Sequence, residues 1–394
     1  MARTPAWGIG LAAGLAAPFG IYVLMLLLGS VPYFQRLFMY AHKFNTSFWH
    51  DLDKPEYWGF ATNQVTPFSI NTADGETLYS WHVLPLRTYL RHESRLQSQK
   101  GGFCADVTSA ESFKILKDDP EARLIIYFHG NAGHIAQAVR PDAYHTLTDT
   151  SDYHLLAIDY RGFGKSTGTP TENGLIHDGV AAVSWAMDVA GIPSDRIVIM
   201  GQSLGTAVTS GVAEHFAMQG VEFAGIILIA GFSDMQTLLS SYTAAGFIPI
   251  LSPIRTIPPL LRFLHRFILD KWKSTDRLAN VVSTTRNRLR LTLIHAKDDL
   301  EIPCHESDAL FKCASSATMG EELDDDQFGV WKEGKTTRKQ DGSFVSVATA
   351  KPDIVIRQEL VRYGGHNGIM LSSQVALAVL RSFEPGTEKP PVAA

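Results

Sequence analysis

Short apolar runs alternate with longer amphipathic stretches along most of the chain. Each run has the pattern of a strand buried on both faces, and helical stretches such as 172–189 separate them. The runs lie at 124–128, 155–158, 197–200, 226–229 and 291–294. A later strand is predicted at 353–363, and Asp74-Gly75 and Asp341-Gly342 indicate hairpin turns, the first within 65–85. The pattern predicts an α/β fold, a mostly parallel sheet with helices on both faces.

The N-terminal pattern is different. Between Arg3 and Arg36 there is no charged residue, and Trp7 to Leu28 is an almost unbroken apolar run. The run is long enough to cross about 30 Å of hydrocarbon as a helix, and such helices tolerate glycines and a central Pro18. A cleaved signal peptide is the alternative, but its apolar region usually has only about 7–15 residues. The pattern favours an N-terminal transmembrane helix acting as a signal anchor.

The positive charges that flank the apolar run do not determine the orientation of this anchor in the membrane. Arg3 and the terminal amine on one side are balanced by Arg36 and Lys43 on the other. Asn45 begins an Asn-Thr-Ser glycosylation sequon just beyond the anchor. The sequon favours a lumenal catalytic domain, because N-glycosylation is found on segments that are secreted or face the lumen.

Residues 201–205 read Gly-Gln-Ser-Leu-Gly, between the apolar run 197–200 and a helical stretch. G-x-S-x-G between a strand and a helix is the nucleophile elbow of α/β-hydrolases. Such a turn holds its serine in strained backbone, and side chains at Gly201 or Gly205 would collide with the flanking elements. The start of the helix offers free N–H groups to a developing oxyanion. We therefore predict that Ser203 is a nucleophile.

A serine nucleophile needs a base and an acid, which in this fold follow in the order acid, then histidine. After the run 291–294 comes the segment 295–303, which reads HAKDDLEIP. Its spacing favours Asp299 as the acid, with Asp298 second. Asp234, after an earlier strand, is a weaker alternative.

The expected base is His366, which lies among glycines in a loop before a predicted final helix at 372–383. The chain has fourteen histidines, so position in the fold decides the choice. The order and the strand-end positions predict the triad Ser203, Asp299 and His366.

An oxyanion hole is predicted where the run 124–128 enters the small-residue loop 129–133, His-Gly-Asn-Ala-Gly. A loop at this place in the fold directs backbone N–H groups into the site. The expected donors are the backbone N–H groups of Asn131 and Leu204.

The segment 159–166, DYRGFGKS, is superficially similar to a phosphate-binding loop. That loop needs a glycine five residues before the glycine of G-K-S, and Asp159 stands there instead. We interpret the segment as a structural loop. The sequence has no metal cluster and no cofactor signature, and its three cysteines fit no metal-binding spacing, so neither a cofactor nor a metal is expected.

Four segments together resemble those of membrane-anchored α/β-hydrolase-domain lipases. They are HGNAG at 129–133, DYRGFGKS at 159–166, GQSLG at 201–205 and HAKDD at 295–299. The resemblance, which extends over about 64–383, is to the monoacylglycerol and lysophosphatidylserine lipases of the endoplasmic reticulum. It implies a serine hydrolase of single-chain lipid esters, and it maps the family's triad onto Ser203, Asp299 and His366.

The length of 394 residues fits one α/β core with insertions. We expect a membrane anchor at 1–35, a hydrolase domain at 36–383 and a disordered proline-rich tail at 384–394. Insertions are expected at about 87–121 and 314–352. A helical cap is expected at about 235–285, between the strands predicted at 226–229 and 291–294. Residues 246–273 are apolar with interleaved basic residues, a composition suited to an acyl chain and anionic lipid; a helical cap buried against the core is the alternative.

The net charge of −5 gives no reason to expect a nucleic-acid surface. The resemblance implies a lipid ester as substrate, and the N-terminal apolar run indicates a bilayer as partner; the sequence makes no prediction of oligomeric state. Two functional classes stay open, a membrane-anchored lipid esterase and a non-catalytic membrane scaffold with the same fold. Within the enzymes, a palmitoyl-protein thioesterase is an alternative, although the chain has no cysteine before Cys104 to carry an acyl anchor. No feature supports a peptidase.

Overall fold

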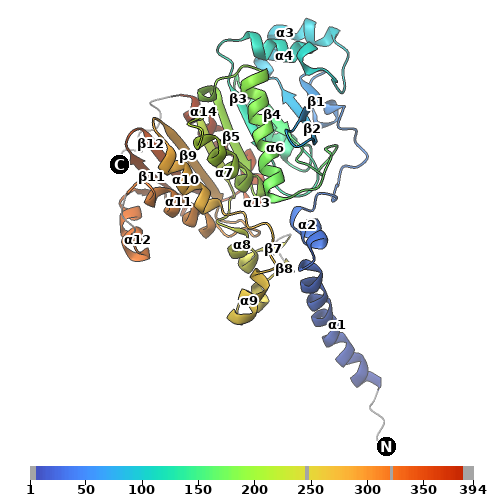
Figure 1. Cartoon of the computed structure of the whole chain (residues 1–394), viewed down its shortest axis with the longest axis vertical. Coiled ribbons are helices and arrows are strands. Elements are labelled where there is room, and N and C mark those ends of the chain that lie inside the picture. Colours follow the sequence, from blue (N-terminus) through green and yellow to red (C-terminus); the bar gives the residue numbers. More distant parts are fainter. Residues whose placement is uncertain (1–5, 245–247, 320–322, 385–394) are drawn as a thin grey trace, which may run out of the picture.

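The computed structural model describes residues 6–244, 248–319 and 323–384, with the backbone alone at 6–16, 244, 248 and 249. The tail predicted at 384–394 lies, except for Glu384, outside these residues. One large sheet with helices on both faces forms the body, and a long N-terminal helix projects from one end of it (Figure 1).

Among the described residues the main sheet has ten strands in the order β1-β2-β4-β3-β5-β6-β9-β12-β11-β10. Their bounds are β1 Val65–Asn71, β2 Thr77–Val83, β3 Leu124–Phe128, β4 His154–Ile158, β5 Ile197–Gln202, β6 Gly225–Ile229, β9 Leu289–Ala296, β10 Thr336–Arg338, β11 Phe344–Ala350 and β12 Ile354–Val361. The central pairs from β4 to β12 are parallel, and the pairs at both edges are antiparallel. The predicted strands and both predicted hairpins are confirmed.

The strands β3, β4, β5 and β6 are mostly apolar because both of their faces are buried. In β3, Leu124 and Ile126 belong to one core, while Ile125 and Tyr127 belong to the other. This division follows from the alternation of side chains along a strand.

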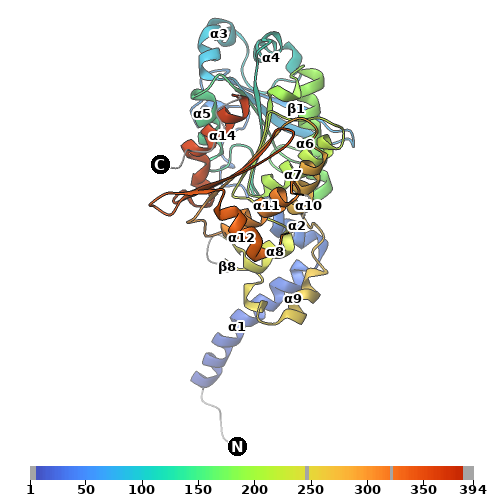
Figure 2. The same cartoon turned by 90° about the vertical axis from the view of Figure 1, so that its left-hand side faces the viewer.

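Helices cover the two faces of the sheet. One face carries α6 Glu172–Ser184, α7 Leu204–Ala217, α10 Ser274–Thr284 and α11 His305–Ser316, and the other carries α5 Arg140–Asp149 and α14 Ser373–Phe383. Figure 2 shows α14 and α5 on the side of the sheet opposite α7 and α11. The prediction of helices on both faces is confirmed.

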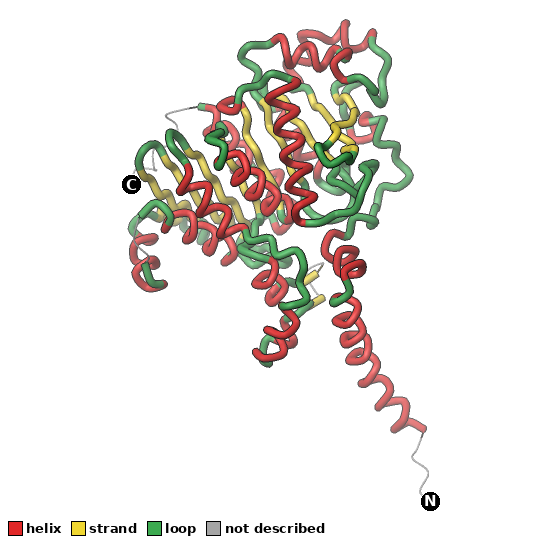
Figure 3. The backbone as a smooth tube through the Cα atoms, viewed as in Figure 1, coloured by secondary structure: helices red, strands yellow, loops and turns green. Residues whose placement is uncertain are grey.

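The cap follows β6. It contains α8 Met235–Ser241, the two-stranded sheet of β7 Thr243–Ala244 and β8 Ile248–Pro249, and α9 Pro258–His265. The range expected for the cap also includes α10, but that helix packs on α7 and α11 and covers the sheet. Figure 3 shows α8 and α9 extending away from the body, on the same side as the N-terminal helix.

The N-terminal segment forms two helices, α1 Ala6–Gly29 and α2 Pro32–Tyr40. Among the described residues, no single helix has both the length and the apolar character of a membrane span. Ala17–Gly29 and Pro32–Tyr40 reach these criteria as a pair, with a bend of 104° between them.

The two predicted insertions lie away from the N-terminal helices. Residues 87–121 include all but the first residue of α3 Leu86–Ser98, and α4 Glu111–Asp118, at the opposite end of the molecule (Figure 1). Residues 314–352 contain α12 Asp325–Glu333 and the strands β10 and β11, which extend one edge of the main sheet.

Candidate active site

Ser203 occupies the turn between β5 and α7. Its φ of 55° and ψ of −122° lie in a region that side-chain-bearing residues rarely adopt. A Cβ at Gly201 would lie 2.1 Å from the carbonyl oxygen of Gly205, and a Cβ at Gly205 would lie 1.9 Å from that of Phe128. The two glycines are therefore required by close backbone contact, as the sequence predicts.

The structure brings the three predicted triad side chains together from separate loops. Ser203 Oγ lies 2.9 Å from Nε2 of His366, and Nδ1 of His366 lies 2.8 Å from Oδ2 of Asp299. All three residues are buried. Because ionised Asp299 can only accept, it holds the proton of His366 on Nδ1 and leaves Nε2 to accept from the serine hydroxyl.

The surroundings of Asp299 keep it ionised. Its Oδ1 accepts hydrogen bonds from the backbone N–H groups of Glu301 and Ile302, each at 2.9 Å, and Nε2 of His295 lies 3.3 Å from Oδ2. Burial by itself raises the pKa of Asp299, but the hydrogen bonds from His295, His366 and Ile302 outweigh it and hold that pKa well below its usual range.

Opposing effects also act on His366. Burial lowers its pKa, whereas the hydrogen bond and charge of Asp299 and the charge of Glu301 raise it, and the net result is a pKa above the usual histidine value. The imidazolium that would form during catalysis is therefore stabilised.

The two alternative acids have other roles. Asp298 Oδ1 accepts a hydrogen bond from the backbone N–H of Gly365 at 2.8 Å, so it holds the turn that carries His366. Asp234 caps α8 through the backbone N–H groups of Gln236 and Thr237.

Gln202 forms a second hydrogen bond to the turn that carries His366, a contact that the sequence did not predict. Its Nε2 donates to the carbonyl oxygen of His366 at 3.0 Å. Gln202 occupies a variable position of G-x-S-x-G, so the motif gives no indication of this contact. The residue before Ser203 thus fixes the loop that carries His366.

Asn131 and Leu204, the predicted oxyanion donors, line the same cavity as Ser203. Within the described residues, neither backbone N–H has a hydrogen-bond partner. The N–H of Leu204 lies at the first turn of α7, where helix geometry leaves it without an internal partner. Both groups are available to a negatively charged oxygen.

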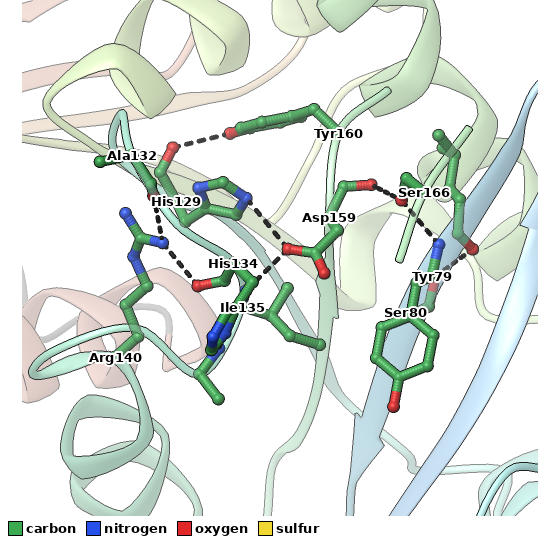
Figure 4. Close-up of polar contacts among 12 residues, drawn as sticks. Tyr79, Ser80, His129, Ala132, His134, Ile135, Arg140, Asp159, Tyr160 and Ser166 are labelled. Atoms are coloured by element: carbon green, nitrogen blue, oxygen red, sulfur yellow. Dashed lines mark hydrogen bonds and ion pairs between the residues drawn. The ribbon is translucent and has the colours of Figure 1, made fainter. Parts of the chain in front are cut away.

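Arg140, at the start of α5, holds the loop that contains Asn131, and no motif in the sequence indicates this role. Its buried guanidinium donates to four carbonyl oxygens of this loop. The acceptors are Gly130 at 3.0 Å, Asn131 at 2.7 Å, Ala132 at 2.9 Å and His134 at 2.6 Å. Figure 4 shows the bonds to Ala132 and His134. Fixing carbonyl groups also fixes the peptide planes that carry the N–H groups.

The segment 159–166 supports the other side of this loop, as expected for a structural element. Tyr160 Oη donates to the carbonyl oxygen of His129 at 2.9 Å, and Asp159 Oδ1 accepts from the backbone N–H of Ile135 at 2.7 Å (Figure 4). Burial raises the pKa of Asp159 to about 7. Ser166 Oγ then donates to the carbonyl oxygen of Asp159.

A cavity of about 480 Å³ opens at Ser203, within the range of about 300–1,000 Å³ usual for small-molecule sites. Its walls are mostly apolar and come from three places: the end of α1 with α2, the cap elements α8 to α9, and the loops beside the triad. They include Met25, Leu26, Phe38, Met235, Leu238, Leu239, Tyr242, Leu264, Phe267 and Ile302. Sequence patterns predicted the cap, but not the contribution of the N-terminal helices.

Three comparisons place this chain among known proteins. The family described as serine aminopeptidase, S33, matches residues 119–290. Protein ABHD12B from Homo sapiens is 30% identical over 289 residues, which cover 73% of this chain and 71% of the relative. Lysophosphatidylserine lipase ABHD12 from Mus musculus is 24% identical over 303 residues, 76% of this chain and 69% of the relative.

A solved structure agrees with the fold. An α/β hydrolase from Vibrio vulnificus superimposes with a TM-score of 0.56 at 14% identity, over 89% of this chain and 94% of that one. At this identity the similarity supports the α/β-hydrolase fold alone.

Proposed function

This chain belongs to the ABHD12 family of α/β-fold serine hydrolases, and we propose that it cleaves single-chain lipid esters, lysophospholipids or monoacylglycerols, at a membrane. The proposal assigns Ser203 as nucleophile, His366 as base and Asp299 as the acid that orients it. Asn131 and Leu204 serve as oxyanion donors through their backbone N–H groups.

One observation carries the choice of substrate, namely the apolar cavity that opens at Ser203. A long acyl chain buries much apolar surface there, which is favourable by about 0.8 kcal/mol for each CH₂ group removed from water. The name of the mouse relative, a lysophosphatidylserine lipase, supports the same substrate class.

The reaction proceeds through an acyl-enzyme. Ser203 Oγ attacks the ester carbonyl carbon while Nε2 of His366 takes the hydroxyl proton. The carbonyl oxygen becomes negative and accepts hydrogen bonds from the backbone N–H groups of Asn131 and Leu204. Collapse of this intermediate breaks the ester bond, and His366 returns its proton to the leaving alcohol of the head group. Water, activated by His366, then releases the fatty acid and restores Ser203.

The test uses full-length protein in vesicles and the matched variant Ser203→Ala. We expect wild type to release fatty acid from lysophosphatidylserine, other lysophospholipids or a monoacylglycerol, and to react with a fluorophosphonate, whereas Ser203→Ala does neither. Equal labelling of both proteins would contradict the assignment of Ser203.

The same experiment separates the alternatives. A palmitoyl-protein thioesterase would cleave an S-palmitoylated peptide and leave the lipid esters intact. A non-catalytic scaffold would turn over neither and would not react with the fluorophosphonate.

For localisation we propose a single-pass protein of the endoplasmic reticulum with a lumenal catalytic domain. Asn45 of the sequon is exposed. Ser47→Ala removes the sequon but keeps Asn45, whose Oδ1 contacts Nε2 of His134. In a lumenal orientation, endoglycosidase should shift the mobility of wild type but not of Ser47→Ala; an unglycosylated wild type would contradict this orientation.

A further inference from the structure

The N-terminal helices are built into the active site. The backbone N–H of Ala132, in the loop after β3, donates to the carbonyl oxygen of Tyr40 at the end of α2. Met25, Leu26 and Gly29 at the end of α1 line the cavity that opens at Ser203. These helices therefore contact both the oxyanion loop and the space expected to hold the acyl chain.

Polar contacts also join these helices to the cap. The buried amide of Gln35 donates to the carbonyl oxygen of Phe267 and accepts from the backbone N–H of Leu269, both at 2.8 Å. Tyr40 Oη donates to Asp270 at 2.8 Å. Separating the two parts would leave these groups without partners, which is unfavourable for buried polar groups.

Both walls of the cavity carry apolar side chains on their outer surfaces. On the N-terminal helices these include Phe19, Leu24 and Leu27, and around α9 they include Ile257, Leu260 and Phe263, all exposed. α1 and α9 project from the same end of the molecule (Figures 1 and 2). Exposed apolar side chains on elements at one end of a molecule are typical of membrane contact.

The charges of the cap indicate what covers this surface. Arg255, Arg262 and Arg266 are exposed beside the apolar residues of α9. Basic side chains next to an apolar helix face complement anionic lipid head groups. A bilayer that contains anionic lipid matches both the exposed apolar side chains and the exposed arginines.

We infer that α1, α2 and α9 together form a portal through which the acyl chain passes directly between the bilayer and Ser203. The N-terminal helix is thus a wall of the substrate site as well as an anchor. The inference rests on the proposed function, since it assigns the cavity to an acyl chain. A substrate that stays in the bilayer avoids transfer of its chain through water.

Two glycines of α1 provide a matched test. A Cβ at Gly29 or at Gly20 would meet no atom within 4 Å. Of the two glycines, only Gly29 lines the cavity. Full-length Gly29→Trp and Gly20→Trp are compared with wild type for the rate at which hexadecyl and ethyl fluorophosphonates label Ser203. We expect Gly29→Trp to slow hexadecyl labelling by about tenfold or more and ethyl labelling far less, because the added ring fills space that only the long chain needs. Gly20→Trp should match wild type with both.

Equal effects of the two tryptophans, or equal effects on the two probes, would overturn the inference. Because labelling requires no particular ester, the result does not depend on the proposed substrate. A wild type that reacts with the hexadecyl probe but hydrolyses no single-chain lipid ester would contradict the proposed function and leave the portal in place.

A second pair of variants tests the bilayer as the partner. Phe263 on α9 and Val330 on α12 are both exposed, at 51% and 79%. In vesicles that contain phosphatidylserine, Phe263→Asp should slow hexadecyl labelling several-fold, and Val330→Asp should not. If Phe263→Asp instead dissociates an oligomer without changing labelling, a second copy covers this surface and the inference is wrong.

Discussion

Nη2 of Arg140 lies 3.0 Å from the carbonyl oxygen of Gly130. In a trans peptide the N–H group points opposite to the C=O group, so this bond turns the N–H of Asn131 away from Arg140. On that side Asn131 lines the cavity beside Ser203. The orientation of the proposed oxyanion donor therefore depends on an arginine nine residues further along the chain.

We predict that Arg140→Met lowers kcat for a soluble ester by about 10²–10³, the usual cost of losing one oxyanion donor, with a smaller change in KM. Arg140→Lys keeps the charge but cannot bond all four carbonyl oxygens, so its kcat should lie between the values of wild type and Arg140→Met. Arg196→Met, which alters a surface arginine paired with Glu121, is the control. Near-ultraviolet circular dichroism checks folding; a folded Arg140→Met with normal kcat would contradict the assigned role.

The neighbouring acids Asp298 and Asp299 should respond differently to the same substitution. Asp299→Asn should lower kcat by roughly 10⁴, because an amide can stabilise the wrong tautomer of His366. Asp298→Asn keeps an oxygen that can accept from Gly365, so its activity should stay within several-fold of wild type. Steady-state kinetics on a soluble ester measure both. The roles are reversed if Asp298→Asn is the crippling change.

The pH dependence should report the charge of Glu301. His366 must be neutral to act as a base, so kcat/KM rises with pH through the pKa of His366 in the free enzyme. Glu301 raises that pKa, and Glu301→Gln removes its charge. The acidic limb of the kcat/KM profile should therefore move to lower pH in Glu301→Gln. A limb that stays in place or moves upward would exclude this coupling.

The arrangement of the candidate catalytic residues was predictable because each of them lies in a segment with a local sequence pattern. The elbow needs Gly201 and Gly205 for close backbone contact, and the spacing after β9 indicated Asp299, which the structure places against His366. The strands of the sheet were predictable for a similar reason, since burial on both faces leaves continuous apolar runs. The roles that these residues have in catalysis stay predictions.

The supporting contacts were not predictable, because they join residues distant in sequence through ordinary side chains. Gln35 bonds the backbone more than 230 residues away in the cap, and nothing near it in the chain indicates a partner. The apolar run at the N-terminus predicted a membrane helix, but an apolar side chain that lines a cavity and one that faces lipid have the same character. Local patterns therefore could not place Met25 or Leu26 in the site.

The last prediction separates anchoring from the formation of the cavity by two truncations. Removal of residues 1–21 deletes the part of α1 before Tyr22 but keeps Met25 to Tyr40, which include the cavity wall and Gln35. This protein should leave the membrane pellet more readily after an alkaline carbonate wash, yet hydrolyse a short soluble ester as wild type does. Its turnover of long-chain lipid in vesicles should fall, because the anchor no longer keeps enzyme and substrate together.

Removal of residues 1–35 also deletes Gln35 and much of one wall. The backbone groups of Phe267 and Leu269 then lose their partners, so we expect a lower melting temperature than for the shorter truncation. This protein should also react more slowly with the hexadecyl fluorophosphonate than the shorter truncation does, because the acyl chain now lies against water on one side. The difference should persist in detergent, where anchoring has no effect. If the two truncations share the same melting temperature and the same labelling rate in detergent, α2 does not contribute to the substrate site, and the N-terminal segment acts as an anchor alone.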